Sequence, residues 1–183
     1  MPKIIRNTFV TLCFSVIMIL GLSPKVHSLS SEVVGFGISS DQTVQSKEFL
    51  ERGLTRLEKG DYTGSIESFQ IAIRYKPNLA EAYFGLGLAY ESLDQLPQAI
   101  AAFKKAASIN PRLVDAYVYL GLVSIEMERL GDAISAFSKA IVLNPNSERA
   151  YFGLGTSYQM LDRCEDAVWA YHQTIRINPN FAD

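Results

Sequence analysis

The sequence contains few of the residues that build metal sites and disulfide frameworks. It has two cysteines and two histidines in 183 residues, and one of each, Cys13 and His27, falls within the first 28 residues. A structural zinc site and a disulfide framework both need more such side chains. Basic residues are not in excess, since 17 Lys and Arg stand against 19 Asp and Glu, whereas nucleic-acid binding needs a positive surface. We therefore expect no metal, no cofactor and no nucleic-acid partner.

Side chains suited to catalysis are also scarce. The other cysteine and histidine, Cys164 and His172, are eight residues apart, which separates them by about 12 Å along a helix axis, too far for a Cys–His pair. We expect no catalytic residue and no enzyme activity in this chain. An alternative is that the chain is the interaction arm of an enzyme whose catalytic part is missing from it.

The N-terminal segment has the pattern of an export signal. Lys3 and Arg6 precede an uncharged apolar run, Thr8–Leu22. As a helix this run would be about 22 Å long, which is short for a permanent span of a hydrocarbon core about 30 Å thick. A positive start followed by such a run is typical of a secretory signal peptide, so we predict one over residues 1–28.

The end of this segment leaves two alternatives open. Val26-His27-Ser28 is similar to a small-residue cleavage site, and cleavage there would give an exported protein, periplasmic, lumenal or secreted. In the alternative, the signal stays uncleaved and residues 8–22 anchor the protein to a membrane. Residues 29–45 hold four Ser and two Gly without sustained periodicity, which favours a flexible linker.

The rest of the chain is an internal repeat. Four prolines recur at intervals of 34 residues: Pro77, Pro111, Pro145 and Pro179. If each proline is position 32, residues 46–181 divide into four units without gaps: 46–79, 80–113, 114–147 and 148–181. A fixed period of this length is the signature of a repeat architecture in which each unit packs only on its neighbours.

Side chains of one kind recur at fixed positions of the four units. Position 8 is glycine, position 20 is small and position 24 is aromatic in every unit. Positions 4, 7, 8 and 11, and then 20, 24, 27 and 28, follow the spacing of one helical face. Each unit is therefore predicted to be two amphipathic helices, A and B, in an all-α fold.

Local signals predict where these helices end and how they pack. Gly60 can take the left-handed conformation after the first helix A, and Asp61 can cap the helix B that follows. A proline disfavours helical dihedrals in the residue before it, so helix B should stop at that residue. The glycine at position 8 costs about 1 kcal/mol in a helix, which close packing against positions 20 and 24 of helix B would offset.

These residues resemble the tetratricopeptide repeat family, whose motif the second unit matches throughout, from Tyr83 at position 4 to Pro111 at position 32. The resemblance covers residues 46–181. It implies a right-handed α-solenoid of four helix-turn-helix units, here preceded by an N-terminal signal or hydrophobic helix. It also implies a protein–protein interaction scaffold that binds a protein or peptide in a concave groove lined by helix A.

The resemblance places positions 2, 5, 9 and 12 of helix A on the groove side, with positions 5 and 9 forming the groove and position 2 its rim. The groove residues are Leu50, Leu54, Phe84, Leu88, Val118, Leu122, Phe152 and Thr156, and the rim residues are Lys47, Glu81, Asp115 and Arg149. The groove residues form an apolar stripe that favours a peptide ligand with apolar anchors, although part of the stripe can instead pack neighbouring helices together. Gly85 and Gly153 at position 6 either deepen the groove for a ligand backbone or have no role.

The last unit suggests a rival function. Its helix B carries Val168, Trp169 and Ile175, and no further helix follows in the sequence to cover them. Either such an uncapped end of a repeat stack is covered by a partner or a second copy, or the sequence is a truncated product. The rival is therefore a structural homo-oligomer that stacks through this C-terminal edge.

Overall fold

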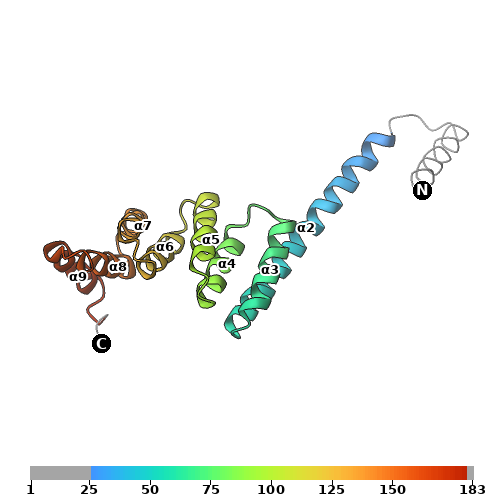
Figure 1. The fold of residues 1–183 in the computed structure, drawn as a ribbon. Coiled ribbons are helices and arrows are strands. Elements are labelled where there is room, and N and C mark those ends of the chain that lie inside the picture. Colours follow the sequence, from blue (N-terminus) through green and yellow to red (C-terminus); the bar gives the residue numbers. More distant parts are fainter. Residues whose placement is uncertain (1–25, 181–183) are drawn as a thin grey trace, which may run out of the picture. The chain divides into compact units, whose positions relative to one another are not determined.

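A computed structural model describes residues 26–180, and every regular element in this range is a helix (Figure 1). The chain divides into two compact units, residues 1–42 and residues 43–183, and the boundary falls inside helix α2 (Val26–Glu58). All but the last three residues of the predicted signal peptide lie outside the described range. None of the helices within residues 26–180 combines the length and the apolar character that crossing a membrane requires.

The second unit is a row of helices in which each packs on the next. After α2 come α3 (Tyr62–Tyr75), α4 (Ala80–Ser92), α5 (Leu96–Ile109), α6 (Val114–Glu126), α7 (Leu130–Leu143), α8 (Glu148–Gln159) and α9 (Cys164–Ile177). Helices α4, α6 and α8 begin at the first residues of the second, third and fourth repeats. The even-numbered helices are therefore the A helices and the odd-numbered helices are the B helices.

Helix α2 continues through residues 29–45, the stretch for which the sequence predicts a linker. Serine and glycine in this stretch argued against a helix, but they lower helix propensity without forbidding a helix. No proline occurs between Pro24 and Pro77, so nothing in this stretch forces the helix to begin later. Helix A of the first repeat is thus the C-terminal part of the longer helix α2.

The predicted ends of the B helices are confirmed. Helices α3, α5, α7 and α9 end at the residue two before each proline, and the residue between takes extended dihedrals as C-cap: Lys76, Asn110, Asn144 and Asn178. The predicted turn of the first repeat is also confirmed, since Gly60 has a φ of 76° and the Asp61 carboxylate accepts a hydrogen bond from the Gly64 N–H at 3.0 Å. The same turn in later repeats puts Asp94, Glu128 and Asp162 at positive φ.

The glycine at position 8 permits the close helix contact that the sequence predicts. A Cβ added at Gly53, Gly87, Gly121 or Gly155 would lie closer than 3.0 Å to a ring carbon of the aromatic residue at position 24 of the same unit. Three of these aromatic residues, Phe69, Phe103 and Phe137, are completely buried. The glycine removes the side chain that would otherwise separate helix A from this ring.

Gly85 and Gly153 pack the units on one another and do not deepen a ligand groove. A Cβ at Gly85 would lie closer than 3.0 Å to the ring of Phe69, and one at Gly153 equally close to the ring of Phe137. Each ring belongs to the preceding unit. Position 6 therefore brings helix A of one unit onto the aromatic residue of the unit before it, which corrects the expectation from the sequence.

The row of helices has two sides, formed by the A helices and the B helices. Among the described helices, α6 contacts α8 directly in addition to its neighbours in the chain. Direct contact between A helices places them on the inner side of the row. We call the exposed side of the A helices the inner surface and the exposed side of the B helices the outer surface.

Candidate functional site

The inner surface carries most of the side chains that the sequence assigns to a ligand groove. Leu54 on α2 and Phe152 on α8 are the most accessible, with 42% and 45% of their surface exposed. The remaining accessible positions are half-buried: Leu50, Phe84, Leu88, Leu122 and Thr156. Partial exposure of apolar side chains leaves them able to contact a ligand.

Val118 does not belong to this surface, although the sequence assigns it there. It is 2% exposed and packs in the same core cluster as Ala150 and Leu154 of α8. Because α8 contacts α6 directly, it covers the side chain that position 5 presents in the third unit. The apolar stripe is thus interrupted at position 5 of the third unit, whereas Leu122 at position 9 of that unit stays half-buried.

Phe84 joins the inner surface to the core. Its ring centroid lies 5.5 Å from that of Phe103, in a tilted arrangement, and 5.5 Å from that of Tyr119, in an edge-on arrangement. Aromatic pairs at these separations stabilise a fold beyond the area that they bury. Phe84 therefore holds the second and third units together, and only its remaining exposed surface is open to a ligand.

The rim residues Lys47, Glu81, Asp115 and Arg149 are all exposed. The guanidinium of Arg149 packs over the Tyr119 ring, with its Cζ 5.3 Å from the ring centroid. Hydrogen bonding to the Tyr119 side chain raises the pKa of Arg149 above its already high value, and the nearby carboxylates of Asp115 and Glu148 add to this effect while burial opposes it. The inner surface therefore carries a fixed positive charge beside an aromatic ring.

Glu91 introduces a carboxylate near this charge. Burial raises its pKa above the ordinary value of 4.5, and the negative charge of Glu126 raises it further, while Arg149 lowers it. Residues of the next two A helices, α6 and α8, thus act on one titratable group of α4. The resemblance places position 12, which is Glu91 in the second unit, on the groove side, but the interactions of Glu91 and Tyr119 do not follow from the sequence, because they are made between units.

Between residues 26 and 180, no group of three or more His, Cys, Asp and Glu side chains lies close enough together to hold a metal ion. Cys164 is an exposed free thiol at the start of α9. The side chains of the inner surface are suited to contact, through apolar area and fixed charge.

The C-terminal edge exposes the side chains that the sequence singles out. Val168 is 68% exposed, and Trp169 and Ile175 are each 53% exposed. Trp169 also packs edge-on against Tyr151 of α8, with 5.9 Å between ring centroids. Within the described residues, α9 is the last helix and has no neighbour beyond it.

Comparison with known proteins places this architecture in a family. The family model described as TPR repeat matches residues 53–94, and the one described as Tetratricopeptide repeat matches residues 80–113. The crystal structure of MamA protein is 30% identical in sequence, with a TM-score of 0.70 over 75% of this chain and 75% of that chain. The chain belongs to the tetratricopeptide repeat family.

Two further structures resemble this tetratricopeptide repeat protein. A second crystal structure of MamA is 29% identical, with a TM-score of 0.72 over 81% of this chain and 86% of that chain. YrrB, described as a TPR protein with an unusual peptide-binding site, is 20% identical, with a TM-score of 0.67 over 74% of this chain and 70% of that chain, so its likeness is one of fold. No curated protein sequence matches the chain.

Proposed function

We propose that this tetratricopeptide repeat protein is an interaction scaffold that binds a protein or peptide along its inner surface. The observation that carries the proposal is the exposure of apolar side chains there, above all Leu54 and Phe152, more than 40% exposed, beside the fixed charge of Arg149. An extended or helical peptide can set apolar side chains against such a row. YrrB, similar in fold, is described as having a peptide-binding site, which supports the same use here.

Replacement of the two exposed apolar residues tests this proposal. Leu54→Glu together with Phe152→Glu should abolish the capture of native partners, because both changes place charge where apolar contact is needed. Phe84 is unsuitable for this test because its ring is part of the core. Met160→Glu is the matched control, since Met160 is 47% exposed but lies after α8.

The measurement is affinity capture from the native host followed by mass spectrometry, with circular dichroism to check the helical content of each variant. The proposal expects the double variant to lose partners that the wild type and Met160→Glu both retain. If the double variant keeps its helical content and captures the same partners, the inner surface is not the binding surface.

Homo-oligomerisation through the C-terminal edge is a second candidate function. It is supported by the exposure of Val168, Trp169 and Ile175 on α9, because exposed apolar patches often mark interaction surfaces. Analytical ultracentrifugation of residues 29–183 should then show a dimer that Trp169→Asp converts to a monomer. A wild-type monomer at all concentrations would exclude this function.

We also propose that the protein works outside the cytoplasm or at a membrane surface. The proposal rests on the charged start and apolar run of residues 1–22. Cell fractionation and N-terminal sequencing of the native protein distinguish its two forms: a mature chain beginning at Leu29 indicates cleavage and export, whereas an intact N-terminus in the membrane fraction indicates an anchor. A full-length protein in the soluble cytoplasmic fraction would contradict both.

A further inference from the structure

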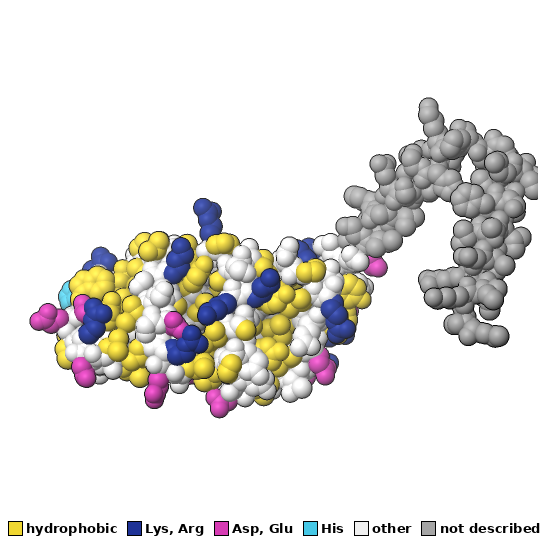
Figure 2. Space-filling model, turned by 45° about the horizontal axis from the view of Figure 1, so that its top comes forward, with side chains coloured by type: hydrophobic (Ala, Val, Ile, Leu, Met, Phe, Trp, Pro, Cys, Tyr) yellow, Lys and Arg dark blue, Asp and Glu magenta, His cyan; other side chains and the backbone are white. Residues whose placement is uncertain are grey.

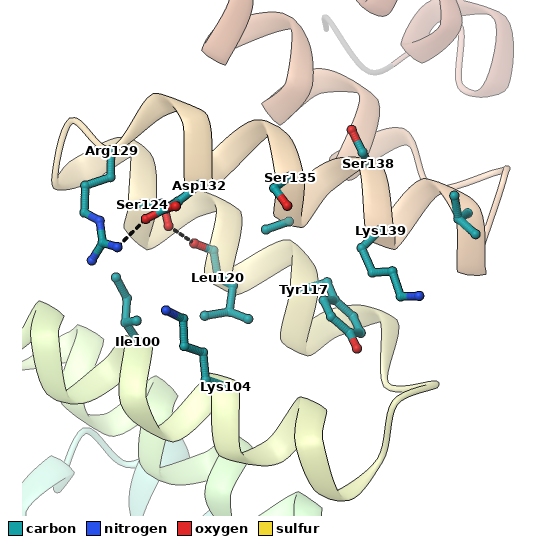
Figure 3. A pocket seen from close by; sticks show the side chains of 12 residues that line it. Ile100, Lys104, Tyr117, Leu120, Ser124, Arg129, Asp132, Ser135, Ser138 and Lys139 are labelled. Atoms are coloured by element: carbon teal, nitrogen blue, oxygen red, sulfur yellow. Dashed lines mark hydrogen bonds and ion pairs between the residues drawn. The ribbon is translucent and has the colours of Figure 1, made fainter.

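A cleft of about 620 Å³ opens on the outer surface between α5, α6 and α7 (Figure 3). Ile100 and Leu120 form apolar parts of its wall, and Lys104 of α5 and Lys139 of α7 lie on opposite sides of it. The cleft is separate from the inner surface, because it lies between two B helices with one A helix behind it. It belongs to the third repeat and its junction with the second.

The cleft lies where the third repeat lacks an aromatic ring. Position 11 of the repeat is Tyr90 in the second unit and Tyr158 in the fourth, but it is Ser124 in the third. Ser124 lines the cleft and is buried, and its hydroxyl donates to the Leu120 carbonyl at 2.6 Å. Since the hydroxyl is satisfied internally, the space beside it needs no polar ligand.

The fourth repeat shows what occupies this space when the ring is present. The Cζ of Arg163 lies 4.5 Å from the centroid of the Tyr158 ring, and Arg163 is paired with Asp166 at 2.6 Å. This arrangement is a cation–π contact with its guanidinium held by a carboxylate. Tyr158 supplies the ring from within the same chain.

The third repeat has the same guanidinium and carboxylate without the ring. Arg129 stands 34 residues before Arg163, forms an ion pair with Asp132, and lines the cleft with it. Figure 3 shows this ion pair at one end of the cleft, beside Ser124. Arg129 is thus the equivalent of Arg163 and is placed to cover an aromatic ring. Ser124 occupies the position of the tyrosine that carries this ring in the fourth repeat.

The charge around the cleft indicates which residues should flank the aromatic side chain of a ligand. Asp132 is neutralised by Arg129, whereas neither Lys104 nor Lys139 forms an ion pair with any residue in the described part of the chain. Figure 2 shows basic side chains spread across the face in view, with acidic side chains along its lower edge. A ligand with acidic residues next to its aromatic side chain complements this charge.

We propose that the outer cleft binds an acidic segment of a partner protein through one aromatic side chain, which lies under Arg129 as Tyr158 lies under Arg163. Acidic residues beside the aromatic one face Lys104 and Lys139. An aromatic anchor in a pocket of this kind usually dominates the affinity of an interface. This site goes beyond the proposed inner surface and does not depend on it.

A second copy of this chain is disfavoured as the occupant. Among the described residues its most exposed aromatic side chain is that of Trp169, which follows Glu165 and Asp166 in α9, so the charge would suit the cleft. However, the Trp169 ring packs against Tyr151 of its own repeat, with 5.9 Å between ring centroids. Insertion into another copy would break that contact.

The direct test fills the cleft with the side chain that the neighbouring repeats use. Binding of a fluorescein-labelled peptide with one phenylalanine between glutamates is measured by fluorescence anisotropy. Ser124→Tyr should weaken this binding at least about tenfold without lowering the thermal midpoint, because tyrosine is the residue of the second and fourth repeats. Replacing the peptide's phenylalanine by alanine should have the same effect. Unchanged affinity in either experiment overturns the proposal.

A second pair of variants keeps the test decisive if Ser124→Tyr does not fold. Lys104→Glu with Lys139→Glu changes two exposed side chains and should also weaken binding at least about tenfold at low salt. Leu54→Glu with Phe152→Glu should leave the peptide affinity within about twofold, which separates this site from the inner surface. If the lysine variants bind as the wild type does, or if Ser124→Tyr instead disperses a dimer in sedimentation, the proposed partner is wrong.

Discussion

The ring of Tyr119 stacks on the ring of Phe103, with 5.5 Å between their centroids and 30° between their planes. At the other two junctions between repeats, glycine holds the position of Tyr119, as Gly85 and Gly153. The junction between the second and third repeats thus depends on an aromatic contact. The other two junctions depend on glycine, which lets helix A approach the ring of the preceding repeat. The position 24 ring of the preceding repeat is fully buried in all three cases.

Tyr119→Ala should therefore lower the free energy of unfolding by about 2 kcal/mol, because it removes a half-buried ring and uncovers Phe103. Phe152→Ala is the control, since Phe152 also pairs with an aromatic residue, Tyr171, but is 45% exposed. Its loss should cost less than half as much. Urea denaturation of both variants measures the difference, and equal losses would mean that Tyr119 does not support the junction.

Gly153→Val should destabilise the protein by about 1–3 kcal/mol, because the new side chain meets the buried ring of Phe137 and the fourth repeat must move away. Gly131→Ala provides the contrast. A Cβ at Gly131, in the first turn of α7, meets nothing within 4 Å, so alanine should raise stability by up to about 1 kcal/mol. Urea midpoints that fall equally in both variants would contradict this account of the packing.

The repeat frame made most of the fold predictable from the sequence. The prolines fixed the ends of the B helices, Gly60 and Asp61 marked a turn, and the glycine at position 8 indicated a close contact inside each unit. The frame did not predict the extension of α2 through residues 29–45, where weak helix formers and no proline leave the local signal undecided. It also did not predict the use of Gly153, because its contact crosses from one repeat to the next.

Glu128→Gly should raise the free energy of unfolding by about 0.5–1 kcal/mol. Glu128 has a φ of 56°, a conformation that glycine adopts without the steric cost of a Cβ. Asp94 has nearly the same φ, 58°, but aspartate tolerates this region better, so Asp94→Gly should gain less. Thermal denaturation ranks the two, and a loss of stability in Glu128→Gly would show that its side chain makes a compensating contact.

The raised pKa of Glu91 predicts a pH-dependent contribution to stability. The folded protein binds this proton more tightly than the unfolded chain, so the group favours folding most below pH 4.5 and this contribution is lost as the pH rises through the raised pKa. Glu91→Gln stays neutral throughout. It should therefore be more stable than the wild type at neutral pH and show a smaller advantage in acid.

Urea midpoints of the wild type and Glu91→Gln, compared from acid to neutral pH, check this prediction. Glu126→Gln should reduce the effect, because Glu126 contributes to the raised pKa of Glu91. A difference between wild type and Glu91→Gln that is the same at every pH would contradict it.

The candidate sites were less predictable than the fold. Positions 5 and 9 identified the inner surface, but Val118 is buried there because α8 covers it. The outer cleft depends on a departure from the repeat at Ser124, where two neighbouring units have tyrosine. Aligning the four units reveals this replacement of tyrosine by serine. The cleft itself forms between helices of two units, so it follows only from their packing.

Site-specific photo-crosslinking in the native host tests the inner surface most directly. Benzoylphenylalanine is placed at Phe152 or Leu54 on the inner surface, or at Lys105, which is exposed on α5. Mass spectrometry then identifies the crosslinked proteins. The scaffold account predicts one shared partner crosslinked from Phe152 and Leu54 and absent from Lys105. Crosslinks from Lys105 alone, or none from either inner position in folded protein, would contradict it.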